Sequence, residues 1–283
     1  MAEVVKFNIA DVFTDRPFAG NQLGVFTDAR GLTSEQMQSL ARELNFSECT
    51  FVLPPEEGGD ARIRIFTPEQ ELPFAGHPTL GTAFVLAAPM QLVIIRLETG
   101  SGIVPVLLER EGARIVFGRM EQPIPSTEAF ERADDLIAAL GVDDVMTSLP
   151  IELYDNGVPH VYVELSSADD VARLEPDFLR LARFGPLGIN CFAVEGTRAK
   201  TRCFVPTMGV PEDPATGSAA GPLALHLARH GRLDWGAELE ISQGNEVGRP
   251  STLYARVEGS RDGVERVEVG GSAVVVAKGE FRL

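Results

Sequence analysis

The chain alternates apolar and polar residues in many short segments, and only a few segments have helical spacing. Residues 4–12, 61–66 and 148–153 read as strands, because alternation is typical of a strand with one buried face. Residues 33–44 and 128–140 repeat their apolar positions at helical spacing and predict two amphipathic helices. The pattern as a whole predicts many strands with few helices between them.

Two further segments lack the polar face of an ordinary surface helix. Residues 78–90 contain no charged residue, and residues 217–228 are nearly free of charge. A helix that is apolar on every side must be buried all round, and these segments are too short to cross a membrane. We therefore expect each helix to lie inside a strongly curved sheet. Because Pro222 is disfavoured beyond a first turn, the second helix either starts late, near Gly217, or is kinked.

The residues at the start of these helices form an internal repeat. The segments FAGHPTLGTA and PEDPATGSAAG align with His77 on Asp213 and Gly81 on Gly217, which are 136 residues apart in a chain of 283. The motifs RIFTP and RCFVP precede the two segments. A repeat of this length predicts duplication of a whole domain rather than a solenoid.

We expect two domains of ordinary size in a chain of this length. The first covers residues 1–122 and is completed by the last strand, at about residues 272–283. The second covers residues 123–271, with the proline-containing segment EQPIPS at the crossover between them.

The two helix starts are candidate anion-binding sites. A helix N-terminus offers free N–H groups and a partial positive charge, and Gly76, Gly81 and Gly217 would let a ligand approach the backbone. Two such starts could hold a carboxylate without lysine or arginine. The alternative is ordinary helix capping, with proline at the first helical position.

Glu48 is the candidate for proton transfer, since it lies among Phe46, Cys49 and Phe51. Apolar neighbours raise the pKa of a carboxyl group, which suits an acid/base near neutral pH. The alternative, a surface glutamate at a strand entrance, is favoured by spacing alone. His77 by itself is more typical of a capping or core histidine. Nothing near Cys49 indicates the lowered pKa of a nucleophile.

Composition excludes several classes of function. The formal net charge of −16 argues against nucleic acid and anionic membrane surfaces as partners. The three cysteines are odd in number and have no CxxC spacing, and the sequence contains no HExxH, Walker or GxGxxG motif. We therefore expect no metal and no cofactor. The start of the chain lacks the pattern of a signal peptide, so the expected location is the cytoplasm.

Five motifs, DVFTDRPFAGN, LNFSECTFV, RIFTPEQELPFAGHPTLGTA, EDPATGSAAGPL and QGNEVGRPS, are specific when they occur together. Through them the sequence resembles the PhzF-like family, the phenazine biosynthesis isomerases within the diaminopimelate epimerase fold. The resemblance implies an α+β fold of two similar barrel-like domains, each a curved, mostly antiparallel sheet around a central buried helix. It also implies an active site in the cleft between the domains, a homodimer and no cofactor.

The resemblance further implies a role for six residues of this sequence. They are Glu48 as general acid/base, His77 and Asp213 as supporting catalytic residues, and Gly76, Gly217 and Ser218 as substrate-binding residues. The implied function is a cofactor-independent isomerase that moves a proton between carbons of a small carboxylate substrate. Related epimerases use two facing cysteines, whereas Glu48 stands at one such position and the motif of the second half contains no cysteine.

Two other functions remain open from the sequence. One is an epimerase or racemase of an amino-acid-like substrate, which deuterium incorporation at a stereocentre would reveal. The other is a non-catalytic protein that binds small molecules. Retention of Glu48, His77, Asp213 and Ser218 together argues against the second alternative, because binding alone needs no acid/base.

Overall fold

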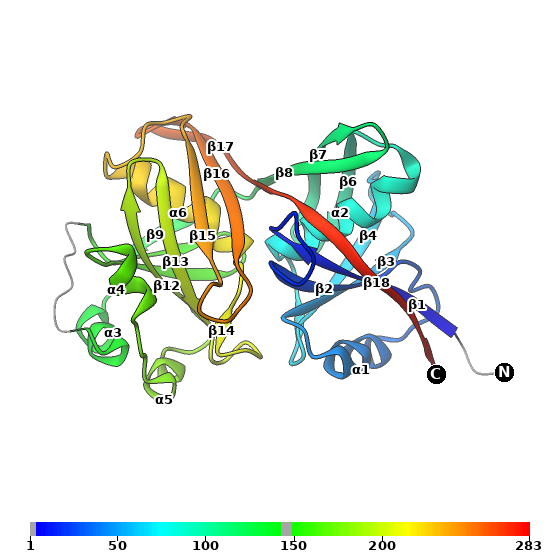
Figure 1. The fold of residues 1–283 in the computed structure, drawn as a ribbon, viewed down its shortest axis with the longest axis horizontal. Coiled ribbons are helices and arrows are strands. Elements are labelled where there is room, and N and C mark those ends of the chain that lie inside the picture. The colour runs from blue at the N-terminus through cyan, green and yellow to red at the C-terminus, as the bar shows by residue number, and fades with distance from the viewer. Residues whose placement is uncertain (1–3, 143–148) are drawn as a thin grey trace. The chain divides into compact units, whose positions relative to one another are not determined.

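The computed structural model describes residues 4–142 and 149–283 and divides into two compact units (Figure 1). Unit 1 consists of Met1–Glu121 and Gly270–Leu283, and unit 2 of Gln122–Val269. Each unit contains a curved, mostly antiparallel sheet with a long buried helix, which confirms the predicted fold class. No helix within the described ranges is long and apolar enough to cross a bilayer.

Unit 1 is built from the two ends of its sequence, because its last strand pairs with its first. Its elements are β1 (Val4–Val12), β2 (Asn21–Phe26), α1 (Ser34–Leu44), β3 (Glu48–Leu53), β4 (Ala61–Phe66), β5 (Glu71–Leu72), α2 (Gly76–Met90), β6 (Ile94–Thr99), β7 (Gly102–Glu111), β8 (Arg114–Gln122) and β18 (Ala273–Arg282). The strands pair in the order β18–β1–β2–β3–β4–β6–β7–β8, with β5 added to β4. The pairs β2–β3 and β4–β6 are parallel and the others antiparallel.

Helix α2 lies inside this sheet, as its lack of charge predicts. It contacts β1, β2, β3, β6, β7 and β18, and its residues from Gly76 to Phe84 are all buried. Gly81 lets the helix approach the sheet closely, since a Cβ there would come within 2.6–2.7 Å of the side chains of Val12 and Leu23. The expectation that Gly81 admits a ligand is therefore wrong, because strand side chains occupy that space.

Unit 2 repeats the arrangement. Its elements are β9 (Ser126–Ala129), α3 (Ala133–Leu140), β10 (Glu152–Asp155), β11 (Pro159–Glu164), α4 (Ala168–Ala172), α5 (Phe178–Leu181), the 3₁₀ helix η1 (Ala182–Phe184), β12 (Gly188–Glu195), β13 (Arg198–Phe204), β14 (Glu212–Asp213), α6 (Gly217–Arg229), β15 (Glu238–Gln243), β16 (Ser251–Ser260) and β17 (Gly263–Gly271). The strands pair in the order β9–β10–β11–β12–β13–β15–β16, with β14 added to β13. As in unit 1, two pairs are parallel, β11–β12 and β13–β15.

Two sequence predictions in this unit need correction. Residues 128 and 129, predicted to begin a helix, belong instead to β9, which pairs with β10, and α3 starts only at Ala133. The strand predicted over residues 148–153 begins at Glu152, while Ser148 lies outside the described residues.

Helix α6 starts late, at Gly217, and contains Pro222 within its length. Proline cannot donate to the carbonyl four residues earlier, which belongs to Ser218. The Asn156 amide donates to that carbonyl instead, at 2.9 Å. Side chains also donate to the two neighbouring carbonyls, Gln122 to Gly217 O and Tyr162 to Ala219 O. The first turn of α6 is therefore held by side chains of the surrounding strands and loops.

Strand pairing corrects the alignment of the repeat. Glu71 of β5 lies opposite Phe66, and Glu212 of β14 lies opposite the matching Phe204. The two glutamates are 141 residues apart, not 136, and this offset also places the start of α2 on the start of α6. In this register ELPFAGHPT matches EDPATGSAA, so His77 corresponds to Ser218 and Leu72 to Asp213. The predicted match of His77 with Asp213 is wrong because small uncharged residues align in more than one register.

Candidate functional site

In unit 1, Glu48 and His77 lie side by side. Glu48 is the first residue of β3, and His77 is the second residue of α2. Nε2 of His77 lies 3.5 Å from Oε2 of Glu48, a distance longer than a typical hydrogen bond. The Glu48 side chain keeps 16% of its surface exposed and that of His77 only 4%. A carboxylate that is largely buried yet reachable by solvent therefore adjoins a buried imidazole.

The loop before β2 holds Asn21 against this pair. Asn21 Nδ2 lies 3.3 Å from Nδ1 of His77. The loop is closed by Asp11, whose Oδ2 accepts from the backbone N–H of Phe18 at 2.7 Å. Gly20 has a φ of +68°, and a Cβ there would lie 2.3 Å from the carbonyl oxygen of Val12. The motif DRPFAGN is thus a rigid loop that orients the imidazole of His77.

In unit 2, the residue matching His77 is Ser218, and it also contacts a residue of the neighbouring sheet. Ser218 Oγ lies 2.9 Å from Nε2 of His160. The Asn190 amide nitrogen contacts the carbonyls of Gly188 and Val161 and therefore is a donor toward His160 Nδ1, at 3.3 Å. His160 then carries its proton on Nε2 and donates to Ser218. The hydroxyl proton of Ser218 remains available to an acceptor.

Asp213 belongs to a second network in unit 2, beside the start of α6. Thr216 Oγ1 donates to Oδ2 of Asp213 at 2.7 Å, and the Gln243 amide donates to the backbone carbonyl of Asp213 at 2.8 Å. The backbone N–H of Thr216 donates to Gln243 Oε1. Asp213 is therefore not the cap of α6, which starts four residues later.

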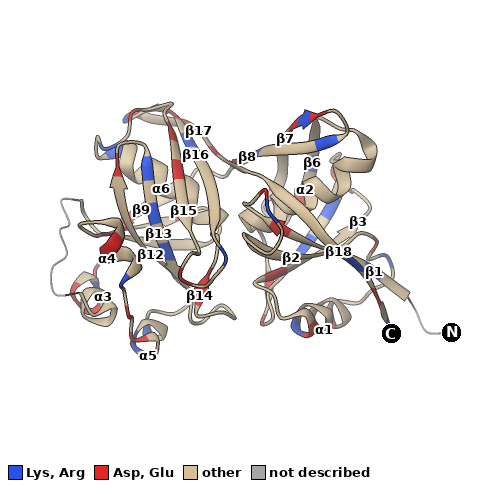
Figure 2. Cartoon of the chain, in the orientation of Figure 1, with Lys and Arg blue, Asp and Glu red and all other residues tan. Residues whose placement is uncertain are grey.

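Both long helices start without a side-chain cap. Ala75 precedes α2 and Thr216 precedes α6, and neither side chain caps its helix. Each start is buried and free of lysine and arginine, and Figure 2 shows α2 and α6 largely in tan, the colour of residues other than Lys, Arg, Asp and Glu. Uncapped first-turn N–H groups and the helix dipole make each start suitable for a carboxylate.

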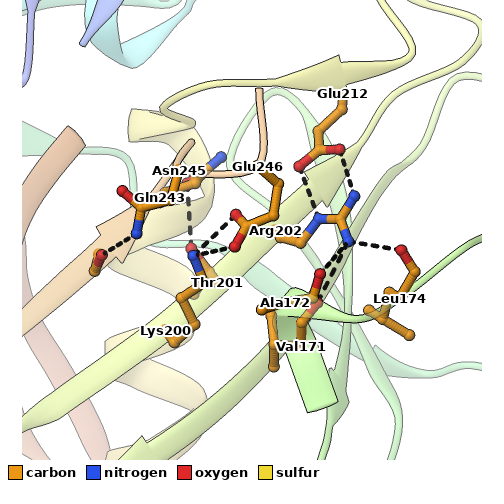
Figure 3. Close-up of polar contacts among 11 residues, drawn as sticks. Val171, Ala172, Leu174, Lys200, Thr201, Arg202, Glu212, Gln243, Asn245 and Glu246 are labelled. Carbon is orange, nitrogen blue, oxygen red and sulfur yellow. Dashed lines mark hydrogen bonds and ion pairs between the residues drawn. The ribbon is translucent and has the colours of Figure 1, made fainter. Parts of the chain in front are cut away.

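The strand that carries Asp213 is fixed by Arg202, which lies on the neighbouring β13. Its guanidinium forms two hydrogen bonds with Glu212, at 2.9 and 2.7 Å (Figure 3). The same group donates to backbone carbonyls at the end of α4 and just after it, as Figure 3 shows, namely those of Val171, Ala172 and Leu174. Both charged side chains are buried, which sets Asp213 in a rigid frame.

The two units differ at the position of Glu48. In unit 1, Glu48 pairs with Leu23 across the parallel strands, and in unit 2 the matching pair is Gly188 with His160. A Cβ on Gly188 would lie 2.2 Å from Nδ1 of His160. Gly188 of unit 2 therefore occupies the position of Glu48 in unit 1, and the imidazole of His160 fills the space beside it.

The cysteines do not supply acid/base groups. Cys49, Cys191 and Cys203 are buried and free. Burial raises the pKa of the Cys49 thiol to about 12 and also raises the pKa values of the other two thiols. A thiolate at neutral pH is therefore disfavoured at all three positions.

Buried histidines should make the protein sensitive to acid. Burial lowers the pKa of His77 and of His160 to about 3, from an ordinary value near 6.5. Below pH 6.5 the unfolded chain therefore binds protons that the folded chain does not, and stability falls as pH falls. We expect each histidine to cost about 2 kcal/mol between pH 7 and pH 5.

Urea unfolding followed by circular dichroism at the two pH values measures this loss. The variant His77→Gln has one buried imidazole fewer and should lose less stability over the same interval. An equal loss in both proteins would show that the pKa of His77 is not lowered by folding.

A carboxylate beside a neutral imidazole, at the start of a helix enclosed by a curved sheet, is an arrangement suited to proton transfer at carbon. The family model of phenazine biosynthesis-like proteins matches residues 10–279. The trans-2,3-dihydro-3-hydroxyanthranilate isomerase of Pseudomonas aeruginosa is 50% identical over 278 residues, which cover 98% of this chain and 99% of that protein.

Comparison with solved structures gives the same family and a similar fold. The PhzF family phenazine biosynthesis protein of Bacillus anthracis is 29% identical with a TM-score of 0.86, covering 99% of this chain and 100% of that one. A predicted epimerase of Pseudomonas aeruginosa is 31% identical with a TM-score of 0.84, covering 98% and 99%. The protein is an isomerase with an epimerase-like fold. It belongs to the phenazine biosynthesis-like (PhzF) family.

Sequence reasoning missed several residues that this geometry brings in. His160, Asn190 and Gly188 support Ser218, and Gln243 supports Asp213. His160 had one detectable signal, a lone histidine placed shortly after an Asn-Gly turn. That signal is weak, because an isolated histidine in a strand is more often a core residue.

Proposed function

We propose that the protein isomerises trans-2,3-dihydro-3-hydroxyanthranilate by moving a proton between carbons of the ring. The relative with 50% identity is named for this reaction, and the match extends over nearly the whole of both chains. The observation that carries the proposal is the placement of Glu48 beside His77 at the start of α2.

Glu48 acts as the general acid/base in this proposal. It removes a proton from one carbon as a carboxylate and returns it to another carbon as a carboxylic acid, so that the residue ends unchanged. His77 is neutral near pH 7, since burial lowers its pKa to about 3. It therefore acts through hydrogen bonds to the substrate or to Glu48, and Asn21 keeps the ring in place.

The start of α6 binds an anionic group of the substrate. Backbone N–H groups of its first turn, from Gly217 onward, attract a carboxylate, and the Ser218 hydroxyl donates to it. Gly76 at the start of α2 has the same role there, and Asp213 accepts from a polar substituent. The expectation that the site lies in a cleft between two domains stays a prediction.

Two-base racemisation is the second candidate. The positions of the cysteines and of Gly188 argue against a racemase that uses two facing cysteines. A racemase needs acid/base groups on opposite faces of one carbon, and in related epimerases these are cysteines. Unit 2 has Gly188 where unit 1 has Glu48, and the described cysteines are buried with raised pKa values. One carboxylate fits a proton that leaves and returns on a single face.

The test is conversion of trans-2,3-dihydro-3-hydroxyanthranilate by the purified protein in D₂O, followed by proton NMR. We expect loss of the substrate signals and deuterium on a ring carbon of the product, because the protonated Glu48, 16% exposed, can exchange its proton with solvent before returning it. Deuterium confined to a stereocentre of unchanged constitution would indicate epimerisation. No conversion, under conditions in which the Pseudomonas aeruginosa relative is active, would reject this substrate.

Ser218→Ala should weaken use of the substrate without loss of the fold. A hydrogen bond to a charged group contributes about 1.5–3 kcal/mol, so we expect kcat/KM to fall about 10- to 100-fold. Steady-state kinetics measures this, with the exposed Ser260→Ala as the matched control in the same unit. Unchanged kcat/KM in Ser218→Ala would remove Ser218 from the binding site.

We further propose a cytoplasmic homodimer that acts on a small molecule only, without nucleic acid or membrane as a partner. The formal net charge of −16 supports the last two exclusions. Light scattering of the purified protein tests the dimer, and a mass equal to one chain of 30.5 kDa would reject it.

A further inference from the structure

Among the described residues, one cluster of potential metal ligands lies apart from the side chains discussed above. It consists of Glu152, His226 and His230, whose ligand atoms all lie within 4.8 Å of one another. Oε2 of Glu152, in β10, is 3.3 Å from Nδ1 of His226 and 2.9 Å from Nε2 of His230. The hydroxyl of Tyr154 is 2.9 Å from the same oxygen and 3.2 Å from Nδ1 of His226.

The positions of the histidines follow from the helix. His226 lies in the last turns of α6, and His230 is the residue directly after Arg229, the end of the helix. Residues four apart share one face of a helix, and two histidines at this spacing are a common way to bind zinc from a helix. Their ring centres are 4.9 Å apart.

Aromatic rings hold the His226 imidazole in place. The ring of Tyr162 stacks on it at 5.8 Å and 20°, while Tyr154 and Phe192 meet it edge to face. His226 is fully buried, and its Nε2 has no hydrogen-bond partner among the described residues. The ring is thus fixed with Nδ1 directed to Glu152, which is the preorganisation that a metal ligand needs.

The contacts of Glu152 are crowded for a hydrogen-bond network alone. One carboxylate oxygen has two lone pairs, yet three groups approach Oε2 within 3.3 Å. Ligand atoms around a tetrahedral zinc ion, with bonds of about 2.0–2.1 Å, lie about 3.3 Å apart. The two histidine nitrogens lie 3.3 and 2.9 Å from Oε2 of Glu152, close to that spacing, and all three ligand atoms lie within 4.8 Å of one another. Small side-chain movements would therefore complete a coordination shell.

We propose that Glu152, His226 and His230 bind one divalent transition metal ion of the zinc class, with Tyr154 or water at the fourth position. Two imidazoles and a carboxylate are a ligand set that zinc favours. The guanidinium of Arg229, 5.9 Å from the centre of the Tyr154 ring, would weaken binding without filling a ligand position.

The site is structural. His226 lies nine residues beyond Gly217, about 13 Å along the helix from the proposed anion site. The sequence HLARH has leucine where hydrolytic zinc enzymes with HExxH have their glutamate, so the general base of that motif is missing. The ion links β10 to the end of α6 and stabilises unit 2. The expectation of no metal considered only cysteine spacing and the complete HExxH motif.

The experiment uses the full-length protein after chelation and desalting, titrated with CoCl₂ and followed by visible absorption. We expect saturation at one ion per chain, with the intense bands of tetrahedral cobalt, and a rise in the thermal midpoint with ZnCl₂. His230→Gln removes one of the three proposed ligands and should weaken cobalt binding by more than about 10-fold, since even the loss of a residue that only hydrogen-bonds a ligand typically costs about 10- to 100-fold in affinity. The nearby exposed Asp234→Asn is the matched control and should bind like the wild type.

A second variant keeps the proposal open to refutation if His230→Gln folds poorly. His230→Cys retains a ligand atom and should add a thiolate-to-cobalt charge-transfer band that the wild type lacks. Equal cobalt binding by the wild type and His230→Gln, no saturable binding by the wild type, or no thiolate band in His230→Cys would each overturn the proposal.

Discussion

Glu48→Gln should abolish turnover of the proposed substrate, trans-2,3-dihydro-3-hydroxyanthranilate, while leaving ligand binding nearly unchanged. An amide has almost the shape of the carboxylate but cannot accept a proton from carbon. Positioned general acid/base groups contribute about 10²–10⁴-fold to rate. Since Glu48 is proposed to serve as both base and acid, we expect kcat to fall by at least about 10³-fold, with Kd changed only a few-fold.

Two measurements separate chemistry from binding in this variant. Proton NMR in D₂O follows both conversion and exchange, and calorimetric titration with the product measures affinity. The control Glu43→Gln removes a carboxylate from the exposed face of α1 and should keep full activity. Wild-type turnover in Glu48→Gln would contradict the role of Glu48 as general acid/base. Loss of product binding together with turnover would make Glu48 a binding residue instead.

The buried helices were predictable because burial on all sides leaves a clear trace in the sequence. The part of α2 from Gly76 to Phe84 is buried among strands and cannot carry a charged side chain without a partner, which accounts for its lack of charge. The last turn does not fit the prediction of burial on all sides, because Ala88, Pro89 and Met90 are exposed. The end of α1 was also predictable. Asn45 adopts the left-handed conformation with a φ of +53°, which asparagine tolerates better than most residues.

The register of the repeat was not predictable from local pattern. Both segments are rich in glycine, alanine, proline and threonine, whose small side chains align almost equally well at offsets of 136 and 141. The choice depends on β5 and β14, strands of two residues each, which are set by pairing with β4 and β13. Pairings between residues distant in the chain decide such cases.

The environment of Ser218 was hidden for the same reason. His160 and Gly188 face each other across two parallel strands, which are separated along the chain by α4, α5 and η1. No periodicity in one strand indicates which residue of the other will lie opposite it. Glu48 and Ser218 were instead found through motif resemblance, and the structure supplies their neighbours.

Arg202→Met should destabilise the protein far more than the matching Arg64→Met. Both arginines form a forked pair with a glutamate of the adjacent short strand, Glu212 and Glu71 respectively. The side chains of Arg202 and Glu212 are 8% and 7% exposed, whereas those of Arg64 and Glu71 are 25% and 42% exposed. The two units of the repeat thus contain the same arginine–glutamate pair, which is buried in unit 2 and close to solvent in unit 1.

The energetic difference follows from what each substitution leaves behind. Removing Arg202 leaves the buried Glu212 carboxylate without its ion-pair partner and takes the Arg202 donor from three backbone carbonyls. Breaking a buried pair in this way typically costs about 3–5 kcal/mol. Removing Arg64 leaves Glu71 in contact with water, and exposed pairs contribute about 0–1 kcal/mol. Urea unfolding of both variants at pH 7 measures the two losses. Equal losses would contradict this argument, because they would show that the frame around Asp213 does not depend on the buried pair.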